Sequence, residues 1–332
     1  MKISASVFAK KEDNLSFLVS ELKRIGVSLL HIDCKDDERV IAALGENQQH
    51  FSLPLDVHLI SAEPQRFFAE LEALNVARVC LQYENLNEIP TSFWSIKAQK
   101  GIALQSHTSL EILAQFPNLD FVMLMCTIPG ESGGKFDVSN FQRINELKNR
   151  FPKLKITIDG GVNSEVAFVL KLLGVDTVVS GSYLLDKNEY GLNMLNLLYP
   201  IAGNTFHVKD FQQPAKFEPV LTLGKFSFRE AVQTIENFKT GYAIVVDENG
   251  KFIGVITNAD VRKTLLKHWN NLDSLAYEEY INFQPIAIAE TDSLQAMLSL
   301  IESQSRIILF LPAIDTEGRF TGVVPLNNLA KG

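Results

Sequence analysis

The strongest constraint on the fold is a regular alternation of short apolar runs with longer amphipathic segments, from residue 1 to about residue 200. The apolar runs predict strands at Ile3–Phe8, Leu29–Asp33, Pro54–Leu59, Arg78–Gln82, Gly101–Leu104, Phe121–Met125, Lys155–Asp159 and Thr177–Ser180. Apolar residues at helical spacing predict helices at Leu15–Ile25, Pro64–Leu74, Val138–Arg150 and Val166–Leu173, two of which end at Gly26 and Gly174. Eight strands with room for helices between them predict an α/β fold. A (β/α)8 barrel and a doubly wound open sheet share this alternation, so the periodicity leaves both open.

The second half of the chain has a different rhythm and contains an internal repeat. The segment from Asp247 to Ile256 recurs 68 residues later, from Asp315 to Val324, and each copy has the glycine-containing turn of a β-hairpin. A predicted helix and a predicted strand precede each copy: Phe228–Phe238 and Ala243–Val246 for the first, Ser293–Ser303 and Ile307–Leu311 for the second. We therefore expect a first domain over residues 1–203, a linker over 204–216, and two tandem α+β units over 217–332.

Composition narrows the class of protein. At 332 residues the chain is long for one core, and its formal net charge of −8 argues against broad binding to nucleic acid or to an anionic membrane. Cys34, Cys80 and Cys126 are far apart in the sequence and predict reduced, buried thiols. The sequence lacks an N-terminal apolar run of signal-peptide length and any run of about 18 apolar residues, so we expect a cytoplasmic protein.

Histidines and aspartates gather at the ends of three predicted strands. Side chains alternate along a strand, so His31 and Asp33 face the same way, as do Asp56 and His58, while Asp159 ends another strand. Taken singly, each pattern is more often a hydrogen-bonded pair or a plain turn. In a barrel, however, the C-terminal strand ends meet at one mouth. His31, Asp33, His58 and Asp159 would then bind one divalent metal: Zn, Fe(II), Mn or Co.

Several segments of the first half form an ordered set of motifs. They are Ile3–Ser6, His31–Asp33, Leu53–Leu59 (L-P-L-D-V-H-L), Met125–Gly134, Ile158–Asn163 (I-D-G-G-V-N) and Ser180–Ser182. As a set, they resemble the ribulose-phosphate 3-epimerase family, whose fold is a TIM barrel. The resemblance covers about the first 200 residues, and it favours the barrel over the open sheet.

This resemblance implies a metal-dependent isomerase that removes and returns the C3 proton of a ketose phosphate through a metal-stabilised enediolate. The chemistry needs a carboxylate on each face of the intermediate, and the resemblance assigns these roles to Asp33 and Asp159. It also implies substrate contacts from Ser6, from Met125 and from phosphate-binding backbone at Gly133, Gly134, Gly160, Gly161, Gly181 and Ser182. Each glycine pair, taken alone, is equally typical of a plain turn.

The substrate-facing positions depart from the family pattern, although the metal ligands are retained. Lys35 and Ile60 stand where the family has methionine, Gln82 replaces a histidine and Lys135 a glutamine. A loop of the family is also replaced by Glu38–Ile41. We therefore predict the reaction type and leave open whether the sugar is a pentose phosphate.

The first hairpin of the repeat runs into Gly254–Asp260, a G-x-x-T-x-x-D stretch that resembles the CBS domain family. The resemblance implies a tandem CBS (Bateman-type) pair, with Thr257 and Asp260 holding the ribose and phosphates of an adenine or other nucleotide. The second copy has Pro325 and Asn328 at the matching positions. One nucleotide cleft is therefore predicted, and a pair that only dimerises the enzyme is the alternative.

Three hypotheses follow for the whole chain. The leading one is a cytoplasmic, homo-oligomeric (dimeric or higher) epimerase regulated by a nucleotide. The second is a non-catalytic sensor of sugar phosphate and nucleotide, which Lys35 and the missing loop favour but the four retained ligands oppose. The third keeps the epimerase chemistry but assigns it to another sugar phosphate, in a nucleotide-sugar or polysaccharide pathway.

Overall fold

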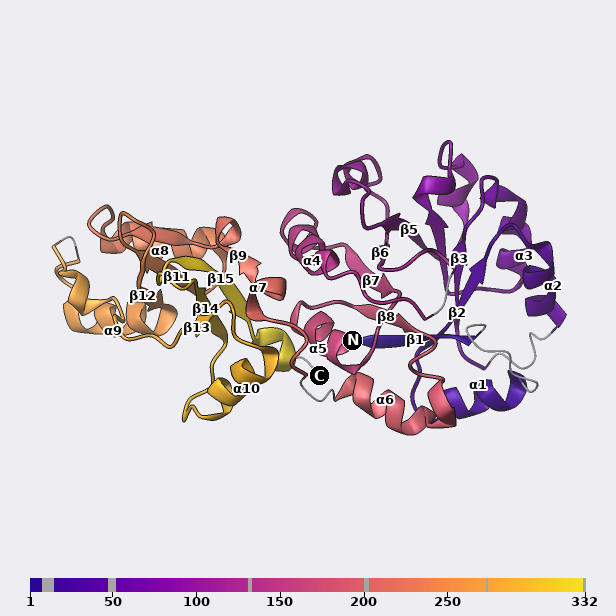
Figure 1. Cartoon of the computed structure of the whole chain (residues 1–332). Coiled ribbons are helices and arrows are strands. Elements are labelled where there is room, and N and C mark those ends of the chain that lie inside the picture. The colour runs from indigo at the N-terminus through magenta and orange to yellow at the C-terminus, as the bar shows by residue number, and fades with distance from the viewer. Residues whose placement is uncertain (8–14, 47–51, 131–132, 200–202, 273, 331–332) are drawn as a thin grey trace. The chain divides into compact units, whose positions relative to one another are not determined.

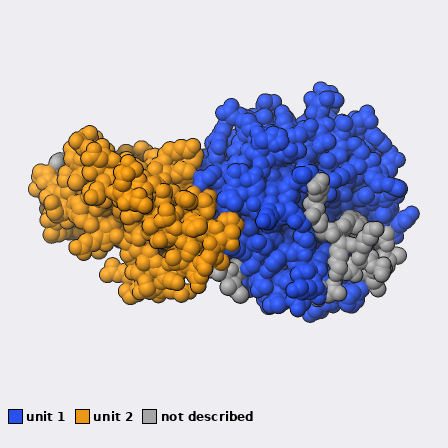
Figure 2. All heavy atoms as spheres, in the orientation of Figure 1, with its two compact units in different colours: residues 1–201, 332 blue, residues 202–331 orange. Residues whose placement is uncertain are grey.

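The computed structural model describes residues 1–7, 15–46, 52–130, 133–199, 203–272 and 274–330 (Figure 1). The chain divides into two compact units, residues 1–201 and 202–331, which Figure 2 shows in different colours. Phe8, at the end of the first predicted strand, and Glu131 and Ser132 of the glycine-containing loop lie outside the described residues.

The first unit contains a closed barrel of eight parallel strands, which confirms the (β/α)8 fold and excludes the open sheet. The strands are β1 (Lys2–Ser6), β2 (Leu29–Cys34), β3 (Leu55–Leu59), β4 (Arg78–Gln82), β5 (Gln99–Gln105), β6 (Phe121–Met125), β7 (Lys155–Asp159) and β8 (Thr177–Ser180). Each pairs with the next, and β8 closes on β1 with Val178 opposite Ile3. These strands read as nearly continuous apolar runs because both faces of a parallel barrel are covered.

Helices surround the barrel, and their ends follow local signals. They are α1 (Leu15–Arg24), α2 (Glu38–Glu46), α3 (Phe68–Ala73), α4 (Ser139–Arg150), α5 (Ser164–Leu172) and α6 (Tyr190–Leu198). Gly26 and Gly174 follow α1 and α5 with φ values of 91° and 74°. The Val27 N–H donates to the Leu22 carbonyl at 3.0 Å, which closes the end of α1 as predicted.

Some connections are tighter than the sequence predicts. The single helix expected at Pro64–Leu74 is a 3-10 turn, η3 (Pro64–Phe67), followed by the short α3. Pro64 lies in the first turn, where its missing N–H leaves no hydrogen bond unmade. The connections around β5 carry only 3-10 turns, η4 (Tyr83–Asn85), η5 (Thr91–Ser95) and η6 (Leu110–Gln115), and η7 (Asp186–Asn188) follows β8.

The barrel interior is packed around an arginine. Gly101 leaves room for the Phe121 ring, which a Cβ at residue 101 would overlap. The guanidinium of Arg78 lies 3.7 Å from the centre of this ring and donates to Thr157 Oγ1 at 2.6 Å. Arg78 also forms an ion pair with Asp56 at 3.6 Å, so the charge of the guanidinium is balanced inside the barrel.

The second unit consists of two small sheets with helices. Its helices and turns are α7 (Val208–Phe211), η8 (Ala215–Phe217), α8 (Phe228–Phe238), α9 (Asn258–His268), η9 (Tyr277–Glu279), α10 (Leu294–Glu302) and η10 (Asn327–Ala330). The sheets have the orders β10-β11-β12 (Val220–Thr222, Tyr242–Val246, Phe252–Thr257) and β13-β14-β15-β9 (Ile288–Ala289, Phe310–Ile314, Phe320–Pro325, Gln213–Pro214). The segment expected to be a linker, 204–216, therefore carries α7 and β9, and β9 pairs with the end of the chain's last hairpin.

The internal repeat forms two equivalent hairpins that face each other. Both strands of β14-β15 begin and end 68 residues after those of β11-β12. The turns exchange equivalent hydrogen bonds, from Phe252 N–H to the Gly318 carbonyl (2.9 Å) and from Phe320 N–H to the Gly250 carbonyl (3.0 Å). Each bond is the counterpart of the other under the repeat, so the two hairpins are related by approximate two-fold symmetry.

The position of the second hairpin's first strand was predicted wrongly. The apolar run suggested Ile307–Leu311, whereas β14 is Phe310–Ile314. The turn that starts at Asp315 sets the register, because its position pairs Leu311 with Val324 and leaves Ile307 91% exposed.

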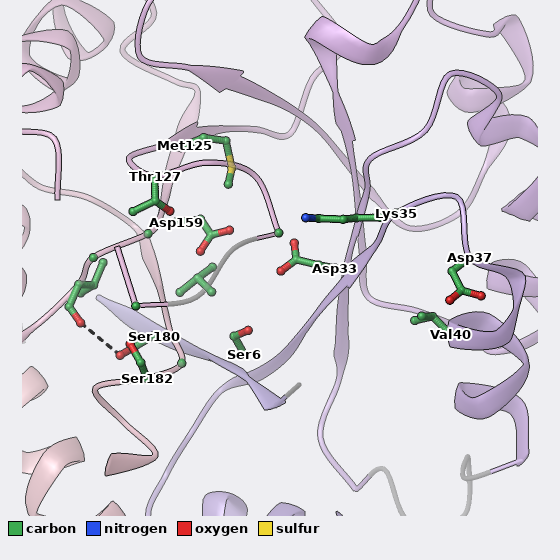
Figure 3. A pocket seen from close by; sticks show the side chains of 17 residues that line it. Ser6, Asp33, Lys35, Asp37, Val40, Met125, Thr127, Asp159, Ser180 and Ser182 are labelled. Atoms are coloured by element: carbon green, nitrogen blue, oxygen red, sulfur yellow. Dashed lines mark hydrogen bonds between the residues drawn. The ribbon is translucent and has the colours of Figure 1, made fainter. Parts of the chain in front are cut away.

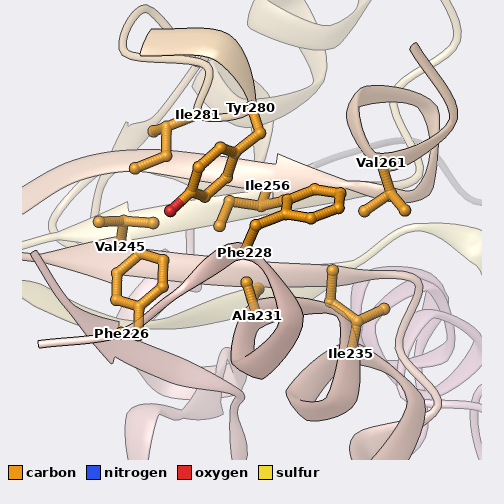
Figure 4. Close-up of a cluster of buried hydrophobic side chains, with 10 residues drawn as sticks. Phe226, Phe228, Ala231, Ile235, Val245, Ile256, Val261, Tyr280 and Ile281 are labelled. Carbon is orange, nitrogen blue, oxygen red and sulfur yellow. The ribbon is translucent and has the colours of Figure 1, made fainter. Parts of the chain in front are cut away.

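The core of the first repeat lies between α8 and the sheet (Figure 4). Phe228, Ala231 and Ile235 occupy one face of α8 at spacings of three and four residues, and all three are buried. Ser227 and Glu230 form a capping box at the start of this helix. The helix is therefore specified both by its apolar face and by its cap.

No helix within the described ranges combines the length and the apolar character needed to cross a bilayer.

Candidate active site and metal centre

The four predicted metal ligands converge at the C-terminal mouth of the barrel. His31 and Asp33 lie on β2, His58 on β3 and Asp159 at the end of β7. Asp33 and Asp159 line a cavity of about 320 Å³ (Figure 3), whereas the imidazoles of His31 and His58 are fully buried. The carboxylates thus face the cavity, and the histidines support them from inside the barrel.

The distances among these groups suit a single ion. His31 Nε2 lies 3.4 Å from Asp33 Oδ1 and 3.5 Å from Asp159 Oδ2. His58 Nδ1 lies 3.0 Å from the same oxygen of Asp33. One ligand atom from each of the four residues falls within 4.8 Å of every other.

A buried carboxylate determines which nitrogen of His31 faces the cluster. Asp56 Oδ2 lies 3.2 Å from His31 Nδ1 and accepts from Ser4 Oγ at 3.1 Å. Burial raises the pKa of Asp56, but the hydrogen bond with His31 and the charge of Arg78 outweigh it, and the pKa is lowered. Asp56 is therefore an acceptor, and Nδ1 carries the proton. The lone pair of His31 Nε2 is buried, and this atom has no hydrogen-bond partner among the described residues.

His58 is oriented from the other side, because its Nε2 lies 2.9 Å from Gln82 Oε1. With that proton donated to Gln82, Nδ1 presents its lone pair to Asp33. Lone pairs of both imidazoles thus point at carboxylate oxygens, an arrangement that is repulsive unless a cation lies between them.

Two nitrogen and two oxygen donors fit a divalent ion of borderline hardness, such as Zn, Fe(II), Mn or Co. The negative charge of the carboxylates also favours protonation of the neighbouring histidine. Burial lowers the pKa of His31, but Asp33, Asp159 and Asp56 together raise it well above its ordinary value. Burial likewise raises the pKa of Asp33, while His31 and His58 lower it strongly. The cluster therefore requires positive charge, which a metal supplies without protonating the ligands.

Two glycines bring the loops after β6 and β7 together. Gly160 and Gly161 have φ values of 106° and 67°. A Cβ at Gly160 would overlap Thr127, and one at Gly161 would overlap the backbone of Phe136. These glycines are therefore required by conformation and by close approach, in addition to any role in binding phosphate.

Most of the predicted substrate contacts line the cavity. They are Ser6, Met125, Gly133, Gly160, Gly161, Gly181 and Ser182. Figure 3 labels Ser6, Met125 and Ser182 among them. Gly134 is not among the lining residues and packs against the Thr127 side chain instead.

Other lining residues were missed by the sequence reasoning: Thr127, Ser180, Val162, Val179, Asp37 and Val40. The supporting roles of Ser4, Asp56 and Arg78 were missed as well. Strand alternation could have indicated Asp56, because it shares a face of β3 with His58.

The departures from the family pattern have different surroundings. Lys35 lines the cavity, and its stem lies so close to Gly130 that a Cβ there would overlap it. Ile60 also lies next to Gly130. Lys135, in contrast, is exposed and is not among the lining residues. Gln82 is fully buried against His58.

The second unit contains a larger cavity, of about 740 Å³, which both repeats line. Thr257 lines it, together with Arg262 and Arg306. Asp260 is not among the lining residues. Its carboxylate accepts from the backbone N–H and the hydroxyl of Thr257, at 3.0 Å and 2.6 Å, and so caps α9.

Comparison with known proteins places the first unit in a family. The profile described as "Ribulose-phosphate 3 epimerase family" matches residues 2–185. The chain belongs to this family. It is therefore an epimerase, a kind of isomerase, and the predicted resemblance to this family is confirmed.

Individual relatives have the same name. The ribulose-phosphate 3-epimerase of Helicobacter pylori (strain J99) is 31% identical over 221 residues, 61% of this chain and 100% of that protein. The enzyme of the same name from Bacillus subtilis (strain 168) is 28% identical over 204 residues, 57% of this chain and 94% of that protein.

The second unit of this epimerase matches the profile described as "CBS domain" over residues 218–267. Solved structures that resemble it include CBSX2 in complex with AMP (18% identity, TM-score 0.33, covering 38% of this chain and 94% of that one). A CBS domain pair/ACT domain protein from Thermotoga maritima is 25% identical, with a TM-score of 0.31, and covers 38% of this chain and 94% of that one.

Proposed function

We propose that the first unit catalyses metal-dependent epimerisation at C3 of a ketose phosphate. The observation that carries this proposal is the cluster of His31, Asp33, His58 and Asp159, with its two carboxylates facing the cavity. Asp33 comes from β2 and Asp159 from β7, and β1 and β8 separate these strands. Two carboxylates that approach from different strands suit a reaction with one proton transfer on each face of a planar intermediate.

Each acidic residue takes one proton transfer. Asp33 removes the C3 proton on one face and Asp159 returns a proton on the other, and the roles exchange in the reverse direction. A bound divalent metal would supply Lewis acidity, polarising the carbonyl and stabilising the charge of the enediolate. Met125 places an apolar, polarizable surface in the cavity, where the flat intermediate would lie. The buried histidines would complete the coordination of that ion together with the two carboxylates.

The phosphate would be bound by backbone. Gly160, Gly161, Gly181 and Ser182 line the cavity at the ends of β7 and β8. Backbone N–H groups in such turns point at an anion without needing a basic side chain. Ser6, at the end of β1, lies beside them and can donate a hydrogen bond to the sugar.

Solvent-deuterium exchange at C3 tests the reaction. The metal-loaded protein should incorporate deuterium from D2O into a pentulose or hexulose phosphate, and Asp33→Asn and Asp159→Asn should each slow this by about 100-fold or more. Lys135→Gln, which is exposed and outside the cavity, is the control. If the metal-loaded parent exchanges no proton in any ketose phosphate tested, the sensor hypothesis is favoured instead.

We further propose that the second unit binds a nucleotide that regulates the epimerase. Thr257, Arg262 and Arg306 line the same cavity, and the arginines can pair with phosphates. Asp260 acts there through its cap on α9 rather than by direct contact. Calorimetric titration with AMP, ADP and ATP should show binding that Arg262→Gln weakens about 10-fold. If the nucleotide changes kcat/KM of the epimerase, regulation is supported, and if no nucleotide binds, it is contradicted.

A homo-oligomer, dimeric or higher, and a cytoplasmic location stay proposals from the sequence. Light scattering of the purified chain would measure the first, and cell fractionation would measure the second.

A further inference from the structure

Gln82, at the end of β4, forms a hydrogen-bonded bridge to the metal centre. Its side chain is fully buried, and its Oε1 lies 2.9 Å from His58 Nε2. Its amide nitrogen donates to the carboxylate of Glu84 and, at 3.4 Å, to the backbone carbonyl of Ala103. Every polar atom of the amide therefore has a partner.

The partners of Gln82 leave only one orientation for its amide. Glu84 also accepts from the Gln105 backbone N–H at 2.8 Å and from the Thr108 hydroxyl, so its carboxylate serves as a hub for donors. Rotating the amide of Gln82 would point Oε1 at this carboxylate and at the Ala103 carbonyl, where three acceptors would face one another. Oε1 must consequently face His58, and His58 Nε2 must carry the proton.

We infer that Gln82 is a positioning residue for the metal centre. It fixes the tautomer of His58 so that Nδ1 faces Asp33 as a ligand, and it does so without adding charge. This inference rests on the proposed metal-dependent function. The chain of contacts runs from the hub at Glu84, through Gln82 and His58, to the metal ligand Asp33.

The two histidine ligands are supported in chemically different ways. The far nitrogen of His31 is held by the carboxylate of Asp56, whereas that of His58 is held by the neutral amide of Gln82. A carboxylate partner makes an imidazole more basic, and the more basic imidazole binds a metal more tightly. A neutral partner accepts a weaker hydrogen bond from the imidazole N–H than a carboxylate does. His58 is therefore the weaker electron donor of the two histidines, and a bound ion would stay more Lewis acidic. The cluster already contains Asp33, Asp56 and Asp159. Because Gln82 is neutral, it adds no further negative charge there.

Two substitutions separate position from charge. Gln82→Met keeps the length of the side chain but removes the acceptor. Gln82→Glu, made together with Glu84→Gln, supplies a carboxylate to His58 while the new amide at position 84 keeps a donor between the two side chains. We expect Gln82→Met to weaken Co(II) and Zn(II) binding about 10- to 100-fold and to shift the visible absorption of bound Co(II). We expect the double variant Gln82→Glu/Glu84→Gln to match or exceed the metal affinity of the parent while lowering kcat with little change in KM. Gln99→Met, on the exposed first residue of β5, is the matched control and should bind as the parent does.

The measurement is competition with a chromophoric chelator, supplemented by the Co(II) spectrum and by thermal unfolding of the metal-free variants. If Gln82→Met is folded and binds Co(II) with the affinity and spectrum of the parent, the inference is wrong while the proposed function stands. Should Gln82→Met not fold, the double variant Gln82→Glu/Glu84→Gln decides the matter, because a parental spectrum and parental kcat in that variant would contradict the inference equally. If the parent itself binds no divalent metal, both the inference and the proposed function fail.

Discussion

Glu218 is a carboxyl group held in an environment that disfavours its charge. It is 4% exposed and accepts from the Tyr242 hydroxyl at 2.7 Å. Burial raises its pKa from 4.5 to about 7, although the hydrogen bonds of Tyr242 and Gln213 oppose the shift. The folded protein therefore keeps a proton that the unfolded chain loses above its ordinary pKa.

This difference predicts that the second unit loses stability as the pH rises from about 4.5 to about 7. The loss should amount to about 3 kcal/mol and be complete above pH 7. Glu218→Gln does not titrate, so it should melt at a higher temperature than the parent at pH 8, with the gap closing near pH 4.5. Scanning calorimetry at both pH values measures this, with the exposed Glu248→Gln as control. An equal gap at the two pH values would contradict the prediction.

Lys35 gives a second prediction at the residue scale. Among the described residues that line the cavity it is the sole basic side chain, and the acidic ones are Asp33, Asp37 and Asp159. Removing its charge makes the cavity more negative towards an anionic substrate. Lys35→Met should raise KM for a ketose phosphate about 5-fold at low ionic strength, and less at high ionic strength. Steady-state kinetics at two salt concentrations test this, and Lys135→Met should leave KM unchanged.

Among the elements, the loop after β7 is constrained both by its backbone conformation and by close packing. Gly161→Ala combines a positive φ with overlap against the backbone of Phe136. We expect it to lower the free energy of unfolding by about 2 kcal/mol and to raise KM, because the loops that line the cavity must separate. Gly26→Ala has a similarly positive φ but open space around the Cβ position, so it should cost about 1 kcal/mol and leave KM unchanged. Equal KM values for the two variants would refute this reading of the loop.

The start of α9 is the second informative element. Thr257 and Asp260 form a reciprocal capping box there, and the predicted nucleotide contact of Asp260 is taken up by this cap. Thr257→Ala should therefore destabilise the second unit by about 1 kcal/mol even without ligand, while Thr257→Ser should retain the cap. Thermal unfolding in nucleotide-free buffer measures the loss. Unchanged stability would show that the cap is not needed.

Local sequence patterns predicted the bounds of several buried strands correctly. They failed where contacts between distant residues determine which segment forms a strand. The runs that became β4, β6, β7 and β8 were predicted with their observed bounds, and apart from the two end residues of β7 every residue in them is buried. The apolar run before Asp315 was longer than its strand, and only the pairing of Leu311 with Val324 selects which part of it forms β14. Likewise, β9 is a strand only because Val323 of the last hairpin pairs with Gln213.

At the scale of the whole molecule, the metal and the nucleotide should stabilise different units. A metal at 100 times its dissociation constant adds about 2.7 kcal/mol to the first unit alone, a shift of roughly 5–10 °C. Treatment with EDTA should lower one melting transition and leave the other unchanged, and added Co(II) or Zn(II) should restore it. Calorimetry with and without chelator tests this, and a chelator that moved neither transition would argue against the metal centre.

By itself, the sequence determined the eight strands and the repeat of 68 residues, and its resemblance to the epimerase family added the barrel at whose mouth His31, Asp33, His58 and Asp159 converge. The strands, and the side chains that share a face of a strand, follow from local alternation, whereas the choice of a closed barrel over an open sheet came from the resemblance. The tertiary structure alone decided which nitrogen of each histidine faces the cluster. That choice depends on acceptors 24 and 25 residues away, Gln82 for His58 and Asp56 for His31, and hence on strand register rather than on any local pattern.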